Sequence, residues 1–133
     1  MSRYYLQVNQ CQLQRVVQYD NHGIEHALIK LSVGDKCITN EWTFPVNTFN
    51  RIVKHVYRAH QAINTAFRTK RYVDVGTIYK IKLNDVVSIT ARQGGNYYLS
   101  VIVTIDDPFT GENVHVVFVP YMAKYFLQQV KNV

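Results

Sequence analysis

The most regular pattern along the chain is a mainly apolar stripe in its middle, with members three and four positions apart. The stripe consists of Phe49, Ile52, Val53, Val56, His60, Ile63 and Phe67. This spacing is typical of one face of an amphipathic helix. Pro45 ends the segment before it, and Asn47 can cap a helix because its side chain accepts a hydrogen bond from a free backbone N–H. The pattern predicts a helix over residues 48–67.

On both sides of this helix, apolar and polar residues alternate, which is typical of strands with one buried face. Turn residues such as Asn, Asp and Gly separate the alternating segments. We expect strands at 4–19 (one strand or two), 24–33, 36–44, 72–83, 86–92, 97–105 and 113–119. Pro120 then precedes a shorter helical pattern, which predicts a second helix over residues 122–130.

An order of four strands and a helix therefore occurs twice. With 133 residues, of which 47% are hydrophobic, the chain fits one domain with a real core. We expect an α+β fold in which residues 1–133 form a single domain, with pseudo-repeat halves at about 1–70 and 71–133. The halves should form one continuous system of antiparallel sheets, packed by the two helices.

Charge is unevenly distributed along the chain, whose formal net charge is +6. No acidic residue lies between Glu41 and Asp74. This segment holds cations equal in number to the whole net charge, namely Arg51, Lys54, Arg58, Arg68, Lys70 and Arg71. A basic segment without acids favours an acidic partner, of which nucleic acid is the commonest and an anionic membrane the next.

The sequence shows no apolar run behind a basic start, and no stretch near the ~20 apolar residues of a membrane span. We therefore expect a soluble, cytoplasmic protein (host-cell cytoplasm if the chain is viral) with no membrane partner. Cys11 and Cys37 lie far apart in predicted strands, so reduced thiols are expected rather than a disulfide scaffold.

Catalytic patterns are weak in this sequence. The adjacent acids Asp106 and Asp107 precede Pro108, and a hairpin turn explains them. His55 and His60 are five positions apart, about 140° round a helix, so they cannot face one metal ion together. Neither a Gly-rich phosphate loop nor a nucleophile elbow occurs. We expect no enzymatic activity, no metal, no cofactor and no small-molecule substrate.

Binding chemistry is better supported, because the predicted strands carry cations and aromatics but few acids. Single-stranded nucleic acid is held by cations that follow the phosphates and by aromatic faces on which bases stack. The expected nucleic-acid-binding residues are Arg15, Lys30, Lys36, Trp42, Arg68, Lys70, Arg71, Lys80, Lys82, Arg92 and Tyr98. Lys80 and Lys82 should share one face of their strand, as should Ser88 and Arg92. Tyr5 is a further aromatic residue on a predicted strand. For Trp42 and most tyrosines, the alternative is a place in the core or in an interface.

The long helix has two expected roles. Its apolar stripe should hold the fold by covering the first sheet, and the cations of residues 68–71 should extend a basic track begun by the strands. A solvated face is the alternative for the cations opposite the stripe, although solvated helices usually mix both signs of charge. These cations are Arg51, Lys54 and Arg58.

The C-terminal part carries a resemblance to a known fold. Residues 98–112 read YLSVIVTIDDPFTGE, a strand and an Asp-Pro turn with Gly, and a further strand, Pro120 and a helix follow. With the doubled strand-helix outline, this order resembles the Whirly and PC4-like fold of single-stranded-DNA-binding proteins. The lysine-rich and alanine-rich signature of plant Whirly proteins is absent. The chain looks closer to the small single-stranded-DNA-binding proteins of bacteriophages, such as those of lactococcal phages. The resemblance implies a homo-oligomer, a dimer or tetramer, with DNA running over sheet edges between protomers.

These observations favour a sequence-nonspecific single-stranded-DNA-binding protein that coats and protects strands in replication or recombination. An RNA-binding protein or a structural viral protein, such as a coat or nucleocapsid subunit, would also suit a basic, strand-rich chain. A third alternative is an interaction module whose helix docks a partner protein.

Overall fold

The structure is a computed structural model that describes residues 3–35, 38–68, 76–93, 99–107 and 109–133. Within these ranges eight strands and two helices follow one another in two runs of four strands and a helix. The elements are β1 (Arg3–Gln7), β2 (Gln10–Tyr19), β3 (Glu25–Gly34), β4 (Thr39–Pro45), α1 (Val46–Arg68), β5 (Gly76–Lys82), β6 (Val87–Gln93), β7 (Ser100–Asp106), β8 (Asn113–Phe118) and α2 (Pro120–Val130).

The element types and their order confirm the prediction of an α+β fold with two helices. The expected strand region 4–19 consists of two strands, β1 and β2. Helix α2 begins at Pro120 rather than at residue 122. Proline suits the first turn of a helix, because its missing N–H has no intrahelical partner there and its fixed φ is already helical.

The strands form two sheets rather than the expected continuous system. The large sheet has five strands in the order β1-β8-β7-β6-β5, and the small sheet has three in the order β2-β3-β4. Strand β1 pairs with β8 in parallel, so the large sheet is mixed and not antiparallel throughout. The chain changes sheets between β1 and β2, where Val8 N bonds Val117 O at 2.9 Å and Asn9 N bonds Gly34 O at 2.8 Å. The first strand of the chain therefore completes the sheet formed by the last four.

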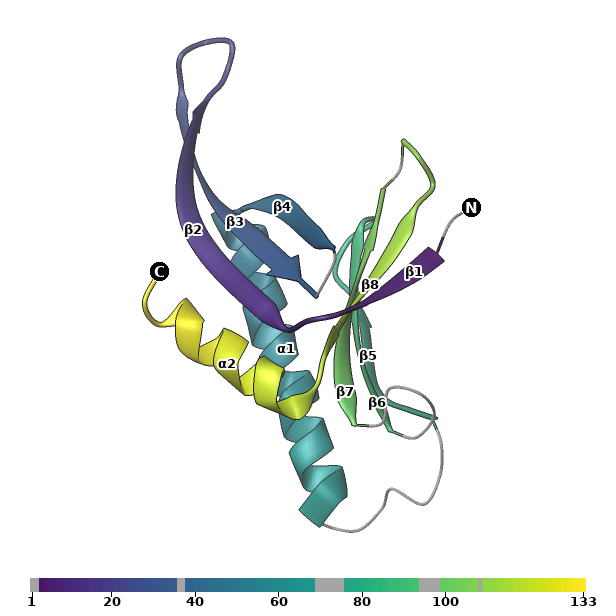
Figure 1. The fold of residues 1–133 in the computed structure, drawn as a ribbon. Helices are drawn as coiled ribbons and strands as arrows, with labels where there is room; N and C mark the ends of the chain where they lie inside the picture. Colours follow the sequence, from purple (N-terminus) through teal and green to yellow (C-terminus); the bar gives the residue numbers. More distant parts are fainter. Residues whose placement is uncertain (1–2, 36–37, 69–75, 94–98, 108) are drawn as a thin grey trace.

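Helix α1 contacts both sheets, and α2 packs against α1, β2, β7 and β8. Both helices lie on the same side of the large sheet (Figure 1). The predicted stripe on α1 is largely confirmed, since Phe49, Ile52, Val56 and Ile63 are buried in the core. Burial of this apolar surface is the main force that holds the helix on the sheets.

One buried residue of α1 lies beside the predicted stripe rather than in it. His55 is only 7% exposed, and its Nδ1 lies 2.7 Å from the Tyr79 hydroxyl on β5. Burial lowers the pKa of His55, and the nearby positive charges of Arg58, Lys54 and Arg51 lower it further. His55 is therefore a neutral hydrogen-bonding contact between α1 and the large sheet at neutral pH.

No helix in the described ranges is long and apolar enough to span a membrane.

Candidate nucleic-acid interface

The side of the large sheet turned away from both helices carries polar and basic residues, and we call it the outer face. Strand register places one row of five side chains across it, one from each strand. The row consists of Lys82, Ser88, Thr104, His115 and Tyr5. With neighbouring strands about 4.8 Å apart, such a row spans about 19 Å. A single-stranded nucleic acid could contact several of these groups at once.

A second row on the outer face runs beside the first. It consists of Lys80, Thr90, Ile102, Val117 and Gln7. The two apolar members in its centre, Ile102 and Val117, are 2% and 0% exposed, yet they lie outside the main core cluster. The centre of this row is therefore closed to solvent, and Lys80 stands at its exposed edge.

The register confirms the predicted face sharing of four residues. Lys80 and Lys82 pair with Thr90 and Ser88, and Arg92 lies two positions further along the same face of β6. The lysines are exposed and Arg92 is partly buried. The three cations therefore lie on one face of two neighbouring strands.

Acidic residues are few on this face. Among the described strand residues that share it, only Asp106, at the end of β7, is acidic. Lys82 Nζ lies 3.7 Å from the Asp85 carboxylate, but these side chains are 72% and 102% exposed. Ion pairs with this exposure contribute little, typically less than about 1 kcal/mol. Lys82 therefore remains available to a polyanion.

An aromatic group occupies the opposite edge of the first row. The rings of Tyr5 and His115 are stacked, with centroids 4.5 Å apart and an interplanar angle of 20°. Thr104 Oγ1 lies 2.9 Å from His115 Nδ1, which fixes the imidazole in place. Tyr5 is 38% exposed, so part of its ring remains in contact with solvent. The outer face thus combines cations at one edge with an oriented aromatic pair at the other.

Two other predicted cations lie on the small sheet, away from the outer face. Lys30 Nζ is 3.6 Å from Glu41 Oε2, so its charge is already partly balanced. Arg15 is exposed and donates from Nη2 to the backbone oxygen of Val133 at 3.2 Å. The structure does not bring Arg15 or Lys30 together with Lys80, Lys82 and Arg92.

Trp42 lies at a cleft between the two sheets that has a volume of about 620 Å³. Tyr4 and Asn40 close one side of it, where Asn40 Nδ2 donates to the Tyr4 hydroxyl at 3.0 Å. Several acids also line this cleft, namely Glu41, Asp106, Asp107 and Glu112. Trp42 is partly buried and packed against the core. Its surroundings favour the core alternative, because phosphates would be repelled there.

The carboxylate of Asp107 keeps its charge well below neutral pH. Backbone N–H groups of Phe109 and Thr110 donate to it and lower its pKa. Asp107 therefore contributes a negative charge to the cleft at neutral and mildly acidic pH.

The remaining predicted site residues cannot be placed on any surface. Lys36, Lys70, Arg71 and Tyr98 lie outside the described residues. Arg68 is the last residue of α1, and only its backbone is described. The basic track expected at residues 68–71 therefore stays a prediction.

The cations opposite the apolar stripe of α1 have separate surroundings. Arg51 donates from Nη2 to the backbone oxygen of Leu83 at 3.1 Å, which ties α1 to the end of β5. Lys54 and Arg58 instead border a groove between α1 and α2. None of the three belongs to the outer face.

Sequence reasoning missed His115 and Thr104 as members of the outer face. Alternation in β8 places His115 on the face opposite Val114 and Val116, which is a readable signal. The contact of His115 with Tyr5 could not be predicted from the sequence, because it depends on the parallel pairing of β1 with β8, two strands far apart in the chain.

Other chemistry finds little support in the described residues. No group of three or more His, Cys, Asp or Glu side chains in these ranges could hold a metal ion. Cys11 is buried, and burial raises the pKa of its thiol to about 12. A thiol that stays protonated at neutral pH is a poor nucleophile and a poor metal ligand.

Comparison of the chain with protein-family models, with curated proteins and with solved structures found no significant match in any of the three. A proposal for its function therefore depends on the chain's own residues.

Proposed function

We propose that this chain is a non-enzymatic, sequence-nonspecific single-stranded-DNA-binding protein that acts as a homo-oligomer and coats strands during replication or recombination. The observation that carries the proposal is the outer face of the large sheet. Lys80, Lys82 and Arg92 would contact phosphates, and Tyr5 with His115 would contact a base. Such contacts are made to phosphates and to the faces of bases rather than to base edges, so we expect little sequence preference.

The partly exposed aromatic pair supports a single strand in preference to a duplex. The chain has a formal net charge of +6, and the outer face offers an aromatic pair that only an unstacked base can reach.

A Whirly or PC4-like arrangement is the fold-level part of the proposal. Two runs of four strands and a helix match that outline in order. The described strands form one sheet of five and one of three. The two halves of the chain therefore repeat the order of elements, but they do not form two equivalent sheets.

The proposal is tested by fluorescence anisotropy with labelled oligonucleotides of matched length. We expect tighter binding to single-stranded DNA than to the duplex of the same sequence, and similar affinity for unrelated single-stranded sequences. Equal or tighter binding to the duplex would contradict the proposal. Tighter binding to single-stranded RNA than to DNA would instead support the RNA-binding alternative.

A further inference from the structure

The hairpin formed by β2 and β3 extends beyond the rest of the small sheet. Strand β4 pairs with β3 only from Leu28 to Gly34, so residues 17–27 form a two-stranded segment, which we call the arm. Every residue of the arm is exposed. It points away from both helices (Figure 1). A two-stranded hairpin standing alone in water is marginally stable at best, so an arm of this kind gains from a partner.

One face of the arm continues the buried face of the small sheet. Ile29, Leu31 and Val33 face the core on β3, and the same register continues outward to Val17 paired with Ala27. Tyr19 lies two positions beyond Val17 on this face. Val17 and Tyr19 are 51% and 65% exposed, and Ile24, which lies in the turn before β3, is 56% exposed. The apolar side of the sheet thus extends past the helices that cover it elsewhere.

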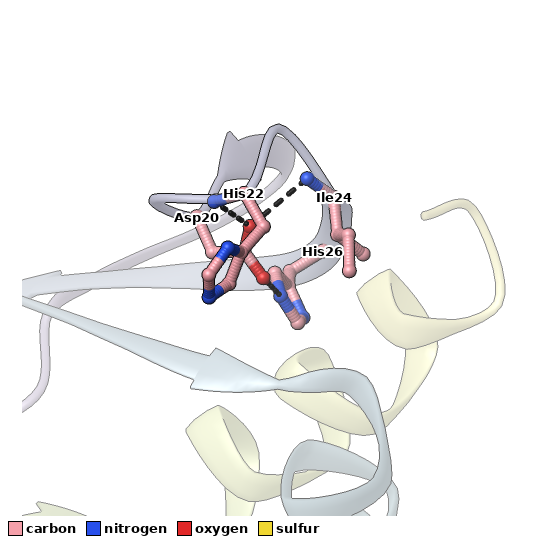
Figure 2. Close-up of polar contacts among 4 residues, drawn as sticks. All are labelled: Asp20, His22, Ile24 and His26. Carbon is pink, nitrogen blue, oxygen red and sulfur yellow. Dashed lines mark hydrogen bonds and ion pairs between the residues drawn. The ribbon is translucent and has the colours of Figure 1, made fainter.

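The tip of the arm is held in a defined shape by one carboxylate (Figure 2). Asp20 Oδ1 accepts from the backbone N–H groups of His22 at 2.8 Å and Ile24 at 2.9 Å. Asp20 Oδ2 lies 3.0 Å from His26 Nε2. Gly23 has a φ of +75°, a conformation that glycine adopts without strain. The arm is therefore preorganised, which lowers the entropic cost of docking.

A groove of about 620 Å³ lies between α1 and α2, and we call it the α1–α2 groove. Val53, Leu127 and Val130 supply its apolar side chains, with Tyr57 at 53% exposure. Its cations are Lys54, Arg58, Lys124 and Lys131. No acid is among the residues that line it.

We propose that the arm of one copy of this chain docks in the α1–α2 groove of a second copy. Both surfaces are apolar, and their charges are complementary. The arm contains Asp20 and Glu25 and no Lys or Arg, whereas the groove carries only cations. Like charges at Lys54 and Arg58 repel one another one helical turn apart. An acidic arm would offset this repulsion while Val17 and Tyr19 cover the apolar floor.

The contact joins two different surfaces of the chain. Two copies that exchange arms reciprocally would form an isologous dimer, whereas copies that each pass an arm to the next would form a heterologous ring or filament. The proposal concerns the contact itself and does not depend on nucleic-acid binding.

The test is sedimentation equilibrium of the full chain without nucleic acid, over a range of concentrations. The arm variant is Val17→Ser with Tyr19→Ser, and the groove variant is Tyr57→Ser with Lys124→Glu. A matched control is Tyr121→Ser, which removes an aromatic residue that is 77% exposed and lies outside both surfaces. Far-UV circular dichroism should remain as in the parent, because all of the replaced side chains are exposed.

We expect the parent to have a mass that is a multiple of the 15.5 kDa of one chain. The arm and groove variants should each raise the dissociation constant at least tenfold, and the control should not. Glu25→Lys alone should also weaken association, because it places a cation opposite the cations of the groove. This variant tests the charge contribution while every apolar side chain stays in place. A parent at single-chain mass at all concentrations would overturn the proposal. Retention of the parent's mass by the arm and groove variants would overturn it as well.

Discussion

Tyr5 and His115 stack at a centroid distance of 4.5 Å although they lie near opposite ends of the sequence. The contact exists because β1 pairs in parallel with β8 and places the two residues side by side. Thr104 holds the imidazole from the next strand. Three strands from both halves of the chain therefore build the aromatic part of the outer face.

Replacing Tyr5 with Ala should weaken binding to single-stranded DNA. Loss of one base stack costs about 1–3 kcal/mol, which corresponds to about 5- to 150-fold in Kd. Fluorescence anisotropy measures this change. Tyr121→Ala is the control, because it removes an exposed tyrosine of α2, which lies on the opposite side of the large sheet from the outer face. An equal effect of the two substitutions would count against base stacking on Tyr5.

The contact between His55 and Tyr79 should matter for stability. Tyr79→Phe would leave the buried Nδ1 of His55 without its partner at 2.7 Å. An unsatisfied buried polar group costs about 1–3 kcal/mol, so the midpoint of urea unfolding should fall. Tyr57→Phe removes a hydroxyl from an exposed position of the same helix and should change the midpoint little. No difference between the two variants would show that the His55–Tyr79 hydrogen bond adds nothing to stability.

Stability should decrease as the pH falls below the ordinary histidine pKa of 6.5. Burial lowers the pKa of His55, and burial followed by the charge of Lys124 lowers the pKa of His60. The unfolded chain therefore takes up protons at a higher pH than the folded chain does. The stabilising contribution is complete above 6.5 and is lost as the pH falls towards the lower folded values.

Urea midpoints measured between pH 7.5 and pH 5 test this linkage. His60→Gln should reduce the dependence on pH, because it removes one of the two groups whose folded pKa is lowered. A midpoint that rises on acidification would contradict the sign derived from the lowered pKa values.

Local patterns predicted most of the secondary structure because each depends on neighbours in sequence. The stripe from Phe49 to Phe67 and the alternation at Lys80 and Lys82 were readable in this way. Pairing between distant strands was not readable, so the mixed large sheet and the place of His115 were missed. Trp42 illustrates the same limit, since only the fold shows the acids that share its cleft.

The most direct test of the account compares how added salt weakens binding to single-stranded DNA in three proteins. These are the parent, Lys80→Gln with Lys82→Gln on the outer face, and Gln12→Glu with Gln14→Glu on the small sheet, which changes net charge equally. Each lost phosphate contact should reduce the slope of log K against log salt concentration by about 0.7. We expect the lysine pair to lower the slope by about 1.4, the sum of two such contacts, and the glutamine pair to leave it unchanged. Equal slopes in all three proteins would place the DNA elsewhere and contradict the outer face as the binding surface.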